Sequence, residues 1–503
     1  MTLIKFNRTW LTFRCLVLAL LCTSACVQQA NAQQLIWQKV FDTGKQDYCA
    51  DVTTDDQGNI IVVGTTIPEE IDPPNHDDFL IIKYNSSGDT LWTRQYNQTV
   101  YDETYCVTTD HAGNIIVGGY IWTESTNSDM HIVKYDSDGN IRWTRTYSNG
   151  MKDVGEYAYG VATDSKDNII VTGKAFYNFG DYVTIKYDSS GNFLWVRTYD
   201  GRWEDYAQDV AVDNFDNIIV TGYSDSNINW DWCTIKYSPD GDTLWVRRYD
   251  VAITDWAFGV TTDREGNVIV AGETHDFYPG SGGSTGMVVK YTSEGDTLWV
   301  KIFKDTLQFA EVGTFADVTT DYDGNIYLAG DYTWWNDSGQ LWRDYYVAKC
   351  NSLGDIVWTT RCDTSWKDEA SGIALDMWGN VIVTGTTELT YPYGYDYFTV
   401  KLNNDVSSIE ESSLVPYHFI LYPNYPNPFN ASTTIRYDVC SATFIDIKIY
   451  DFLGRQVDVL VCENKLPGSY QAVWDAIDFA SGLYFAQLVA GNHTAIEKLM
   501  LIK

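Results

Sequence analysis

The sequence predicts an all-β protein: a seven-bladed β-propeller over residues 33–402, whose last blade is closed by an N-terminal strand, followed by a small Ig-like β-sandwich. Two observations favour this fold class. A segment of about fifty residues recurs along the chain, and each copy contains four short stretches rich in β-branched and aromatic residues. The composition then changes after Leu402, where a polar stretch leads into a second pattern of alternating strands.

Each repeat carries two marker segments. The first resembles Gly58 to Gly64, Gly-Asn-Ile-Ile-Val-Val-Gly, and the second resembles Lys83 to Arg94, which contains a Leu-Trp pair. The Asn of the first segment recurs at Asn59, Asn114, Asn168, Asn217, Asn267, Asn325 and Asn380. The Lys of the second recurs at Lys83, Lys134, Lys186, Lys236, Lys290, Lys349 and Lys401.

The first repeat predicts four strands, which we call a (50–54), b (59–65), c (79–84) and d (90–96). Gly, Asn and Asp occupy the tight a-to-b and c-to-d connections, where a hairpin needs positive φ. An Asp precedes each a-to-b turn and a Lys recurs in each strand c, and this regularity predicts structural turn and ion-pair roles for these residues. Four strands per repeat is typical of a propeller blade.

The ends of the repeat region predict how the ring closes. The seventh repeat, 369–402, has strands a, b and c but lacks a Leu-Trp strand d. Residues 35–41, Leu-Ile-Trp-Gln-Lys-Val-Phe, match the strand d sequence of 91–96. We therefore expect the N-terminal strand to complete the seventh blade, which leaves no open sheet edge.

The repeat resembles the bacterial SBBP β-propeller repeat. The match follows the pattern of 205–222, in which Asp216 replaces the first Gly, and it covers about residues 35–402. The resemblance implies an extracellular or surface protein of mostly unassigned function. Residues 241–245, Gly-Asp-Thr-Leu-Trp, are also similar to the tryptophan docking motif of quinoprotein propellers, but no cofactor constellation accompanies them, so we expect no cofactor.

The first 32 residues predict a secretory signal peptide. Lys5, Arg8 and Arg14 precede an apolar run, and a small-x-small pattern places cleavage between Ala32 and Gln33. A lipid-anchored reading would use Cys26 instead. The remaining chain has no apolar run of about 18 residues, so we expect no transmembrane segment in the mature protein.

The acidic composition excludes one large class of partner. The chain has 34 Lys+Arg against 68 Asp+Glu, a formal net charge of -34. Such a surface repels a polyanion, so we expect no nucleic-acid partner.

Residues 403–415 predict a polar linker, and residues 416–503 predict the sandwich. This last segment resembles the type A C-terminal sorting domain of the type IX (Por) secretion system of Bacteroidetes. The matching segments are 424–429, 449–455, 468–475, 480–485 and the terminal Lys503. The resemblance implies recognition by that machinery, passage through the periplasm, and release or attachment at the outer-membrane surface. Cys440 and Cys462 depart from the usual pattern, and whether they pair stays open.

Two groups of residues are candidates for binding, because the d-to-a and b-to-c connections are long and variable. The first is aromatic and offers rings that can stack on sugars, or that pack between loops instead. It comprises Trp122, Trp203, Trp230, Trp256, Trp334, Trp335, Trp366, Tyr391 and Tyr393.

The second group is acidic and precedes strand a in six repeats. These carboxylates either ring the channel mouth and attract cations, calcium among them, or cap their own loops. They are Asp47, Asp102, Glu156, Asp205, Asp255 and Asp368.

The sequence therefore predicts a secreted or cell-surface, non-catalytic protein that recognises glycan or protein through its variable face. Catalytic motifs such as a nucleophile elbow or paired metal-binding His residues are absent from the sequence. The alternative is an extracellular polysaccharide-degrading enzyme, a lyase or glycoside hydrolase, with a carboxylate pair hidden among the many Asp and Glu residues.

Overall fold

The computed structural model describes most of the chain in segments. These are 35–67, 77–123, 127–150, 155–175, 180–225, 229–250, 254–275, 284–303, 310–335, 341–390, 394–404, 420–421, 424, 427–439, 443–465, 468–490 and 493–503. The expected signal peptide with its Ala32–Gln33 cleavage site, most of the expected linker, Tyr391, Tyr393 and Cys440 lie outside them. The chain divides into two compact units, Met1–Asp405 and Val406–Lys503.

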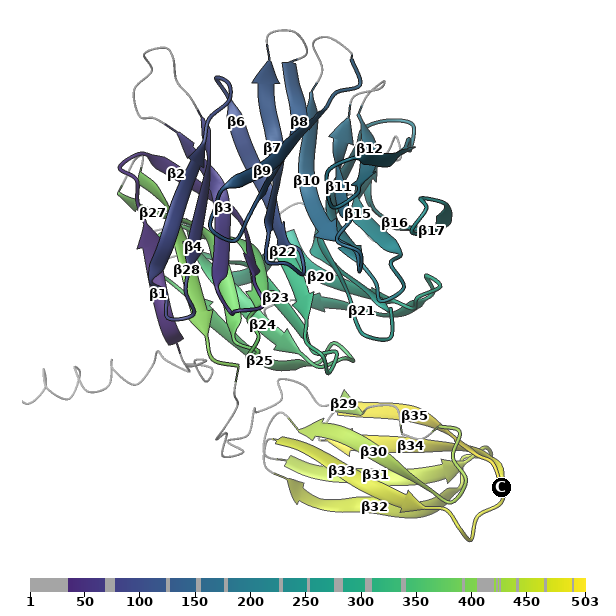
Figure 1. Cartoon of the computed structure of the whole chain (residues 1–503). Helices are drawn as coiled ribbons and strands as arrows, with labels where there is room; N and C mark the ends of the chain where they lie inside the picture. The colour runs from purple at the N-terminus through teal and green to yellow at the C-terminus, as the bar shows by residue number, and fades with distance from the viewer. Residues whose placement is uncertain are drawn as a thin grey trace, which may run out of the picture. The chain divides into compact units, whose positions relative to one another are not determined.

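Every regular element that the structure describes is a β-strand, so the predicted all-β class is confirmed (Figure 1). In the first unit, sheets follow one another in chain order, each with its strands in sequential antiparallel order. The first sheet contains β2 (Gln46–Thr54), β3 (Ile60–Ile67), β4 (Asp78–Tyr84) and β5 (Thr90–Tyr96). The second contains β6 (Asp102–Thr109), β7 (Ile115–Thr123), β8 (Asn127–Tyr135) and β9 (Ile141–Tyr147). The third contains β10 (Glu156–Thr163), β11 (Ile169–Ala175), β12 (Asp181–Tyr187) and β13 (Phe193–Tyr199).

The middle of the unit has two further groups of four strands, joined into one sheet by a single parallel bridge between Trp230 and Thr254. The first group is β14 (Asp205–Val212), β15 (Ile218–Asp225), β16 (Trp230–Tyr237) and β17 (Thr243–Tyr249). The second is β18 (Thr254–Thr262), β19 (Val268–His275), β20 (Ser284–Tyr291) and β21 (Thr297–Phe303). The next sheet is β22 (Ala310–Thr320), β23 (Ile326–Trp335), β24 (Leu341–Cys350) and β25 (Ile356–Cys362).

The last sheet of the unit joins the two ends of the repeat region. Its order is β1-β28-β27-β26, from β1 (Leu35–Phe41), β26 (Asp368–Leu375), β27 (Val381–Thr390) and β28 (Gly394–Leu402). β1 and β28 run antiparallel, with Phe41 opposite Tyr397, so the pairing predicted for the N-terminal strand is present. The last sheet also contacts the first, because Thr54 Oγ1 donates to the Leu375 carbonyl at 2.8 Å.

Buried middle strands form the core between neighbouring sheets. Ile60 to Val63 of strand b are all 0% exposed, because the sheets pack against one another on both faces. Strand d is held to the next sheet by polar bonds: Trp92 Nε1 donates to the Ser137 carbonyl at 3.2 Å, and Arg94 Nε donates to the Gly139 carbonyl at 2.9 Å. Strand d therefore stabilises the contact between sheets as well as its own sheet.

The repeated Asp and Lys have the structural roles expected of them. Asp55 accepts hydrogen bonds from the backbone of its own turn and forms a buried ion pair with Lys83 at 2.9 Å. Lys83 Nζ also donates to the Ser137 carbonyl of the next sheet. The same ion pair recurs at Lys134–Asp110, Lys186–Asp164, Lys236–Asp213, Lys290–Asp263 and Lys401–Asp376.

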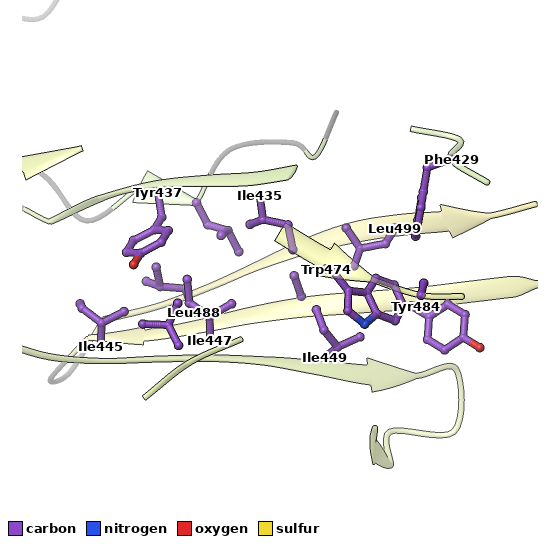
Figure 2. Close-up of a cluster of buried hydrophobic side chains, with 14 of the residues drawn as sticks. Phe429, Ile435, Tyr437, Ile445, Ile447, Ile449, Trp474, Tyr484, Leu488 and Leu499 are labelled. Atoms are coloured by element: carbon purple, nitrogen blue, oxygen red, sulfur yellow. The ribbon is translucent and has the colours of Figure 1, made fainter. Parts of the chain in front are cut away.

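The second unit has two sheets around one core. One sheet has the order β29-β30-β33, from β29 (Ile420–Leu421), β30 (Ser432–Val439) and β33 (Gly468–Asp475). The other has the order β32-β31-β34-β35, from β31 (Thr443–Asp451), β32 (Gln456–Lys465), β34 (Gly482–Ala490) and β35 (His493–Leu501). Figure 2 shows Trp474 among side chains of the opposite sheet, such as Ile449 and Tyr484, and all three belong to one buried cluster.

Candidate functional site

The six acidic residues before strand a do not form an open ring at the channel mouth. All six are 0% exposed, and four of them, Asp47, Asp102, Asp205 and Asp368, accept backbone N–H groups of the loops that precede them. Asp47 Oδ2 accepts the backbone N–H of Thr43 at 2.7 Å, and Asp368 Oδ2 accepts that of Thr364 at 2.8 Å. The burial of these six residues and the contacts of Asp47 and Asp368 favour the second expectation, in which the carboxylates cap their own loops, over an open ring at the channel mouth.

The predicted aromatic residues are close to their expected end of the strands, but most belong to strands rather than connections. Trp122 ends β7, Trp230 begins β16, Trp256 is in β18, and Trp334 and Trp335 end β23. The placement in loops is wrong because the b–c hairpins continue pairing beyond the repeat, as between Trp122 and Ser128.

Four of these residues have different surroundings. Trp203 is 40% exposed in the d-to-a connection. Trp122 Nε1 donates to Asn127 Oδ1 at 2.8 Å, and Trp334 packs on Trp342 with ring centroids 5.4 Å apart. Trp366 is partly buried before β26, and its carbonyl accepts the Arg343 N–H.

An aromatic cluster forms where two neighbouring repeats meet. Tyr206 stacks on Tyr223 at 5.0 Å between ring centroids, and Trp230 lies 5.3 Å from Tyr223. Trp256 continues the series at 5.8 Å from Tyr223, and His275 follows at 5.3 Å from Trp256. All five rings are partly exposed, so this aromatic cluster offers ring faces or edges to solvent.

Charged groups border the aromatic cluster. Lys174 Nζ lies 3.5 Å from the Tyr206 ring centroid and 3.8 Å from Glu204 Oε2, which accepts the Tyr206 hydroxyl at 3.0 Å. Burial lowers the pKa of Lys174 to about 8, and the neighbouring Glu204 partly opposes that change. On the other side, Glu273 accepts from His275 at 3.1 Å, and this hydrogen bond raises the pKa of His275. The cluster thus combines rings with donors and acceptors, as carbohydrate recognition requires.

A second group of tyrosines continues around the first residues of the a strands. Tyr157 stacks on Tyr159 at 5.9 Å, and Tyr105 lies 5.1 Å from Tyr159. Glu103 accepts hydrogen bonds from both Tyr105 and Tyr120. These tyrosines were missed because they belong to the repeat itself, at the alternate positions of strand a that face away from the buried acid.

A cavity of about 380 Å³ is lined mainly by the a strands, from Tyr48 and Tyr105 to Phe258 and Ser371. Three aspartates, Asp51, Asp209 and Asp317, also line it. Enclosure raises the pKa of all three carboxyls, and Asp209 adds its repulsion to Asp51 and Asp317.

Each of these aspartates bridges two neighbouring a strands. Asp51 accepts the N–H of Val52 at 2.7 Å and, from the next sheet, that of Val107 at 2.8 Å. Asp209 and Asp317 repeat this pattern with Val210 and Val260 and with Val318 and Ile373. These contacts indicate that the three carboxylates hold the a strands together.

The comparisons with known proteins separate the two units. Residues 424–503 match the model of the secretion system C-terminal sorting domain, and residues 113–141 match the model of a domain of unknown function (DUF5122) described as a beta-propeller. An uncharacterized WD repeat-containing protein of Acanthamoeba polyphaga mimivirus is 23% identical over 187 residues. That match covers 28% of this chain and 13% of the relative's length.

Solved structures show likeness at low sequence identity. The β-propeller domain of the Trilobed protease from Pyrococcus furiosus is 14% identical, with 74% of this chain and 100% of that chain covered and a TM-score of 0.43. A polysaccharide lyase, Uly1, is 9% identical over the same shares, with a TM-score of 0.46.

Among the residues that the structure describes, no helix is long and apolar enough to cross a membrane. The first unit is a propeller-like array of four-stranded sheets, and residues 113–141 match a propeller model. The match over residues 424–503 indicates export by type IX secretion to the cell surface or the extracellular space.

Proposed function

We propose that this chain is an exported, non-catalytic binding protein that recognises a glycan through the aromatic cluster Tyr206, Tyr223, Trp230, Trp256 and His275. Residues 33–402 form a seven-bladed propeller of the SBBP repeat type, and residues 416–503 form an Ig-like sandwich that addresses the protein to type IX secretion. The signal peptide, residues 1–32, directs the chain to the periplasm first.

The observation that carries the proposal is the continuous series of partly exposed rings flanked by Lys174, Glu204 and Glu273. Sugar rings present apolar C–H faces and hydroxyls together, so a binding site for them needs aromatic faces beside donors and acceptors. The acidic charge of the chain favours a neutral or cationic glycan over a polyanionic one.

A non-catalytic role is supported by the state of the carboxylates. The cavity-lining Asp51, Asp209 and Asp317 already accept two backbone N–H groups each, which fixes them as structural bridges. His131, a possible general base by residue type, is 3% exposed and hydrogen-bonded to Tyr96. A polysaccharide-degrading enzyme remains the alternative that the following experiment distinguishes.

The test is equilibrium binding of the purified protein to oligosaccharides selected on a glycan array. The Tyr206→Ala and Trp230→Ala variants should each weaken binding by about tenfold or more, because each removes a ring of the cluster. Tyr322→Ala is the matched control: Tyr322 is 78% exposed, in an a-to-b turn at the other end of the strands.

The outcomes separate the possibilities. Unchanged affinity in both cluster variants would refute this site. Release of reducing ends or unsaturated products from a polysaccharide panel would favour the enzyme, and silence on the array with capture of one defined surface protein would favour a protein ligand.

A further inference from the structure

Three acidic positions converge where one repeat joins the next. They are near the start of strand c, just after strand d, and at the start of the following strand a. Burial raises the pKa of the strand c aspartate at four such junctions, and repulsion from the other two carboxylates adds to it. These junctions are Asp181–Asp200–Asp205, Asp231–Asp250–Asp255, Asp344–Asp363–Asp368 and Asp396–Asp42–Asp47.

Two junctions contain an arginine that offsets the negative charge. Arg248 of strand d lies opposite Cys233, two residues after Asp231, and pairs with Asp231 at 3.2 Å. At the equivalent place of another repeat, Arg361 lies 3.5 Å from Asp344. The chain thus provides its own cation where these carboxylates meet.

A third junction is satisfied by a hydroxyl. Thr43 Oγ1 donates to Asp47 at 2.8 Å, and the Thr43 N–H donates to the same carboxylate. Both oxygens of Asp47 therefore accept hydrogen bonds. This junction has no arginine in strand d, because Val40, opposite Phe398, occupies the position that corresponds to Arg248.

The Asp181 junction has neither the strand d arginine nor the threonine before strand a. Thr198, opposite Val183, stands at the register position of Arg248, and Gly201 stands where the other junction has Thr43. Asp205 is 0% exposed, and its Oδ1 atom and the buried Ser224 hydroxyl beside it meet no partner in full hydrogen-bond geometry, although the Ser224 hydroxyl is near enough to oppose the rise that burial causes in the pKa of Asp205. Asp231 Oδ1 and Asp344 Oδ1 are in the same state at the two arginine junctions.

The Gly201 position keeps this space free of side-chain atoms. A Cβ there would lie 2.3 Å from Ser224 Oγ and 2.6 Å from Asp205 Oδ1, so a larger residue would require one of these side chains to move. The remaining oxygen of Asp205 accepts the Gly201 N–H at 2.6 Å, and Asp200 accepts the Arg202 N–H at 2.7 Å. Asp205 Oδ1 is the buried oxygen of this junction that these bonds leave without a partner in full hydrogen-bond geometry.

Two side-chain cations act electrostatically on Asp205, and both have partners of their own. Arg248 pairs with Asp231 and donates to the Ser224 carbonyl at 2.9 Å. Lys174 pairs with Glu204 and lies under the Tyr206 ring. In the ion pairs described for Arg248 and Lys174, neither cation is paired with Asp181, Asp200 or Asp205.

We propose that Asp181, Asp200 and Asp205 form a calcium site at this junction. One oxygen from each carboxylate lies within 4.8 Å of the others, the span expected of oxygens that share an ion at about 2.4 Å. The hard, all-oxygen donor set selects calcium over softer metals, and the ion takes the place that a guanidinium takes at the Asp231 and Asp344 junctions. The calcium proposal does not rest on the glycan proposal, although Lys174, which contacts Tyr206, also acts electrostatically on Asp205.

The experiment uses the purified full protein, stripped with chelator, in calcium titrations followed by calorimetry and by thermal unfolding. We expect saturable binding with a Kd of about 0.1–1 mM, the range of extracellular calcium modules, and a rise in Tm of about 3 °C at calcium one hundred times Kd. Asp181→Asn should weaken binding at least tenfold, because one charged ligand is lost.

Thr198→Arg provides the second variant, because it removes no ligand and copies the arginine of the sister junctions. It should abolish the calcium response while leaving the calcium-free Tm equal to or above that of the wild type. Asp396→Asn is the matched control. It changes the Asp42–Asp47–Asp396 group, whose oxygens also lie within 4.8 Å of one another but whose Asp47 is bonded by Thr43, and it should keep the Asp181 response. The proposal is overturned if folded wild-type protein shows no calcium binding, or if Asp181→Asn and Thr198→Arg bind calcium like the wild type.

Discussion

The buried ion pair between Lys236 and Asp213 gives the most direct prediction about what stabilises the repeats. Lys236 Nζ lies 2.8 Å from Asp213 Oδ2, with side chains only 3% and 0% exposed, and it also donates to the Ser293 carbonyl of the next repeat at 3.1 Å. Lys236→Met leaves a buried carboxylate without its cation and should lower the free energy of unfolding by about 3–5 kcal/mol.

The assay is urea unfolding at pH 7, with Lys301→Met as the control. Lys301 pairs with Asp355 at 3.1 Å, but the two side chains are 37% and 44% exposed, so its loss should change the free energy of unfolding by less than about 1 kcal/mol. Adding Asp213→Asn to Lys236→Met should recover part of the loss, because the stranded charge disappears. Equal effects of the two Lys→Met variants would refute the reasoning.

Three further predictions concern packing, pH and export. Gly160→Ala should lower stability by about 1–3 kcal/mol in urea unfolding, since its Cβ would lie 2.8 Å from the Asp209 Cα; a neutral effect would contradict this close approach. In the presence of chelator, Tm should fall as pH rises from about 5 to 8. Burial raises the pKa of Asp331 to about 7 and the pKa of Asp181 and Asp396 to about 6. In this pH range the folded protein therefore keeps protons that the unfolded chain releases, so a rise in pH destabilises the folded state. Below about pH 4 Tm should fall again, because carboxylates such as Asp213 then become protonated. Burial would raise the pKa of Asp213, but Lys236 and Asn217 hold it below its usual value. A Tm at pH 8 equal to that at pH 5 would contradict the predicted fall between pH 5 and 8. Deleting residues 424–503 should leave the protein in the periplasm, as fractionation and immunoblotting would show, and normal surface export of the truncated chain would disprove the sorting role.

The strand pattern could be predicted from the sequence because each repeat combines a hydrophobic pattern with fixed turn residues. The expected strand b at 59–65 is β3, Ile60–Ile67, and the expected strand d at 90–96 is β5, Thr90–Tyr96. The match between residues 35–41 and strand d likewise predicted the pairing of β1 with β28. The strands follow from local sequence, whereas the closing pair follows from the similarity of residues 35–41 to strand d of the other repeats.

The candidate site could not be predicted in the same way, because it depends on which side of a strand each residue faces. Asp205 and Tyr206 are neighbours in sequence, but Asp205 is buried under its loop while Tyr206 joins the aromatic cluster. The sequence selected Trp230 and Trp256 as candidates yet missed Tyr206 and Tyr223, which connect them.

The calcium junction shows a further limit of the sequence alone. The acidic residues of the four junctions are visible in the sequence, whereas the contacts of Arg248 and Thr43 at sister junctions appear only with strand register and distances. A compensating residue is recognised by its contacts, and these depend on tertiary structure.

The central claim is that the aromatic cluster binds a glycan, and the most direct measurement is a glycan-array screen of the wild type beside Tyr206→Ala. Saturable binding to a defined glycan, lost in Tyr206→Ala and kept in Tyr322→Ala, is the result we predict. Binding that persists in Tyr206→Ala, or an array on which the folded wild type binds no glycan, would contradict the claim.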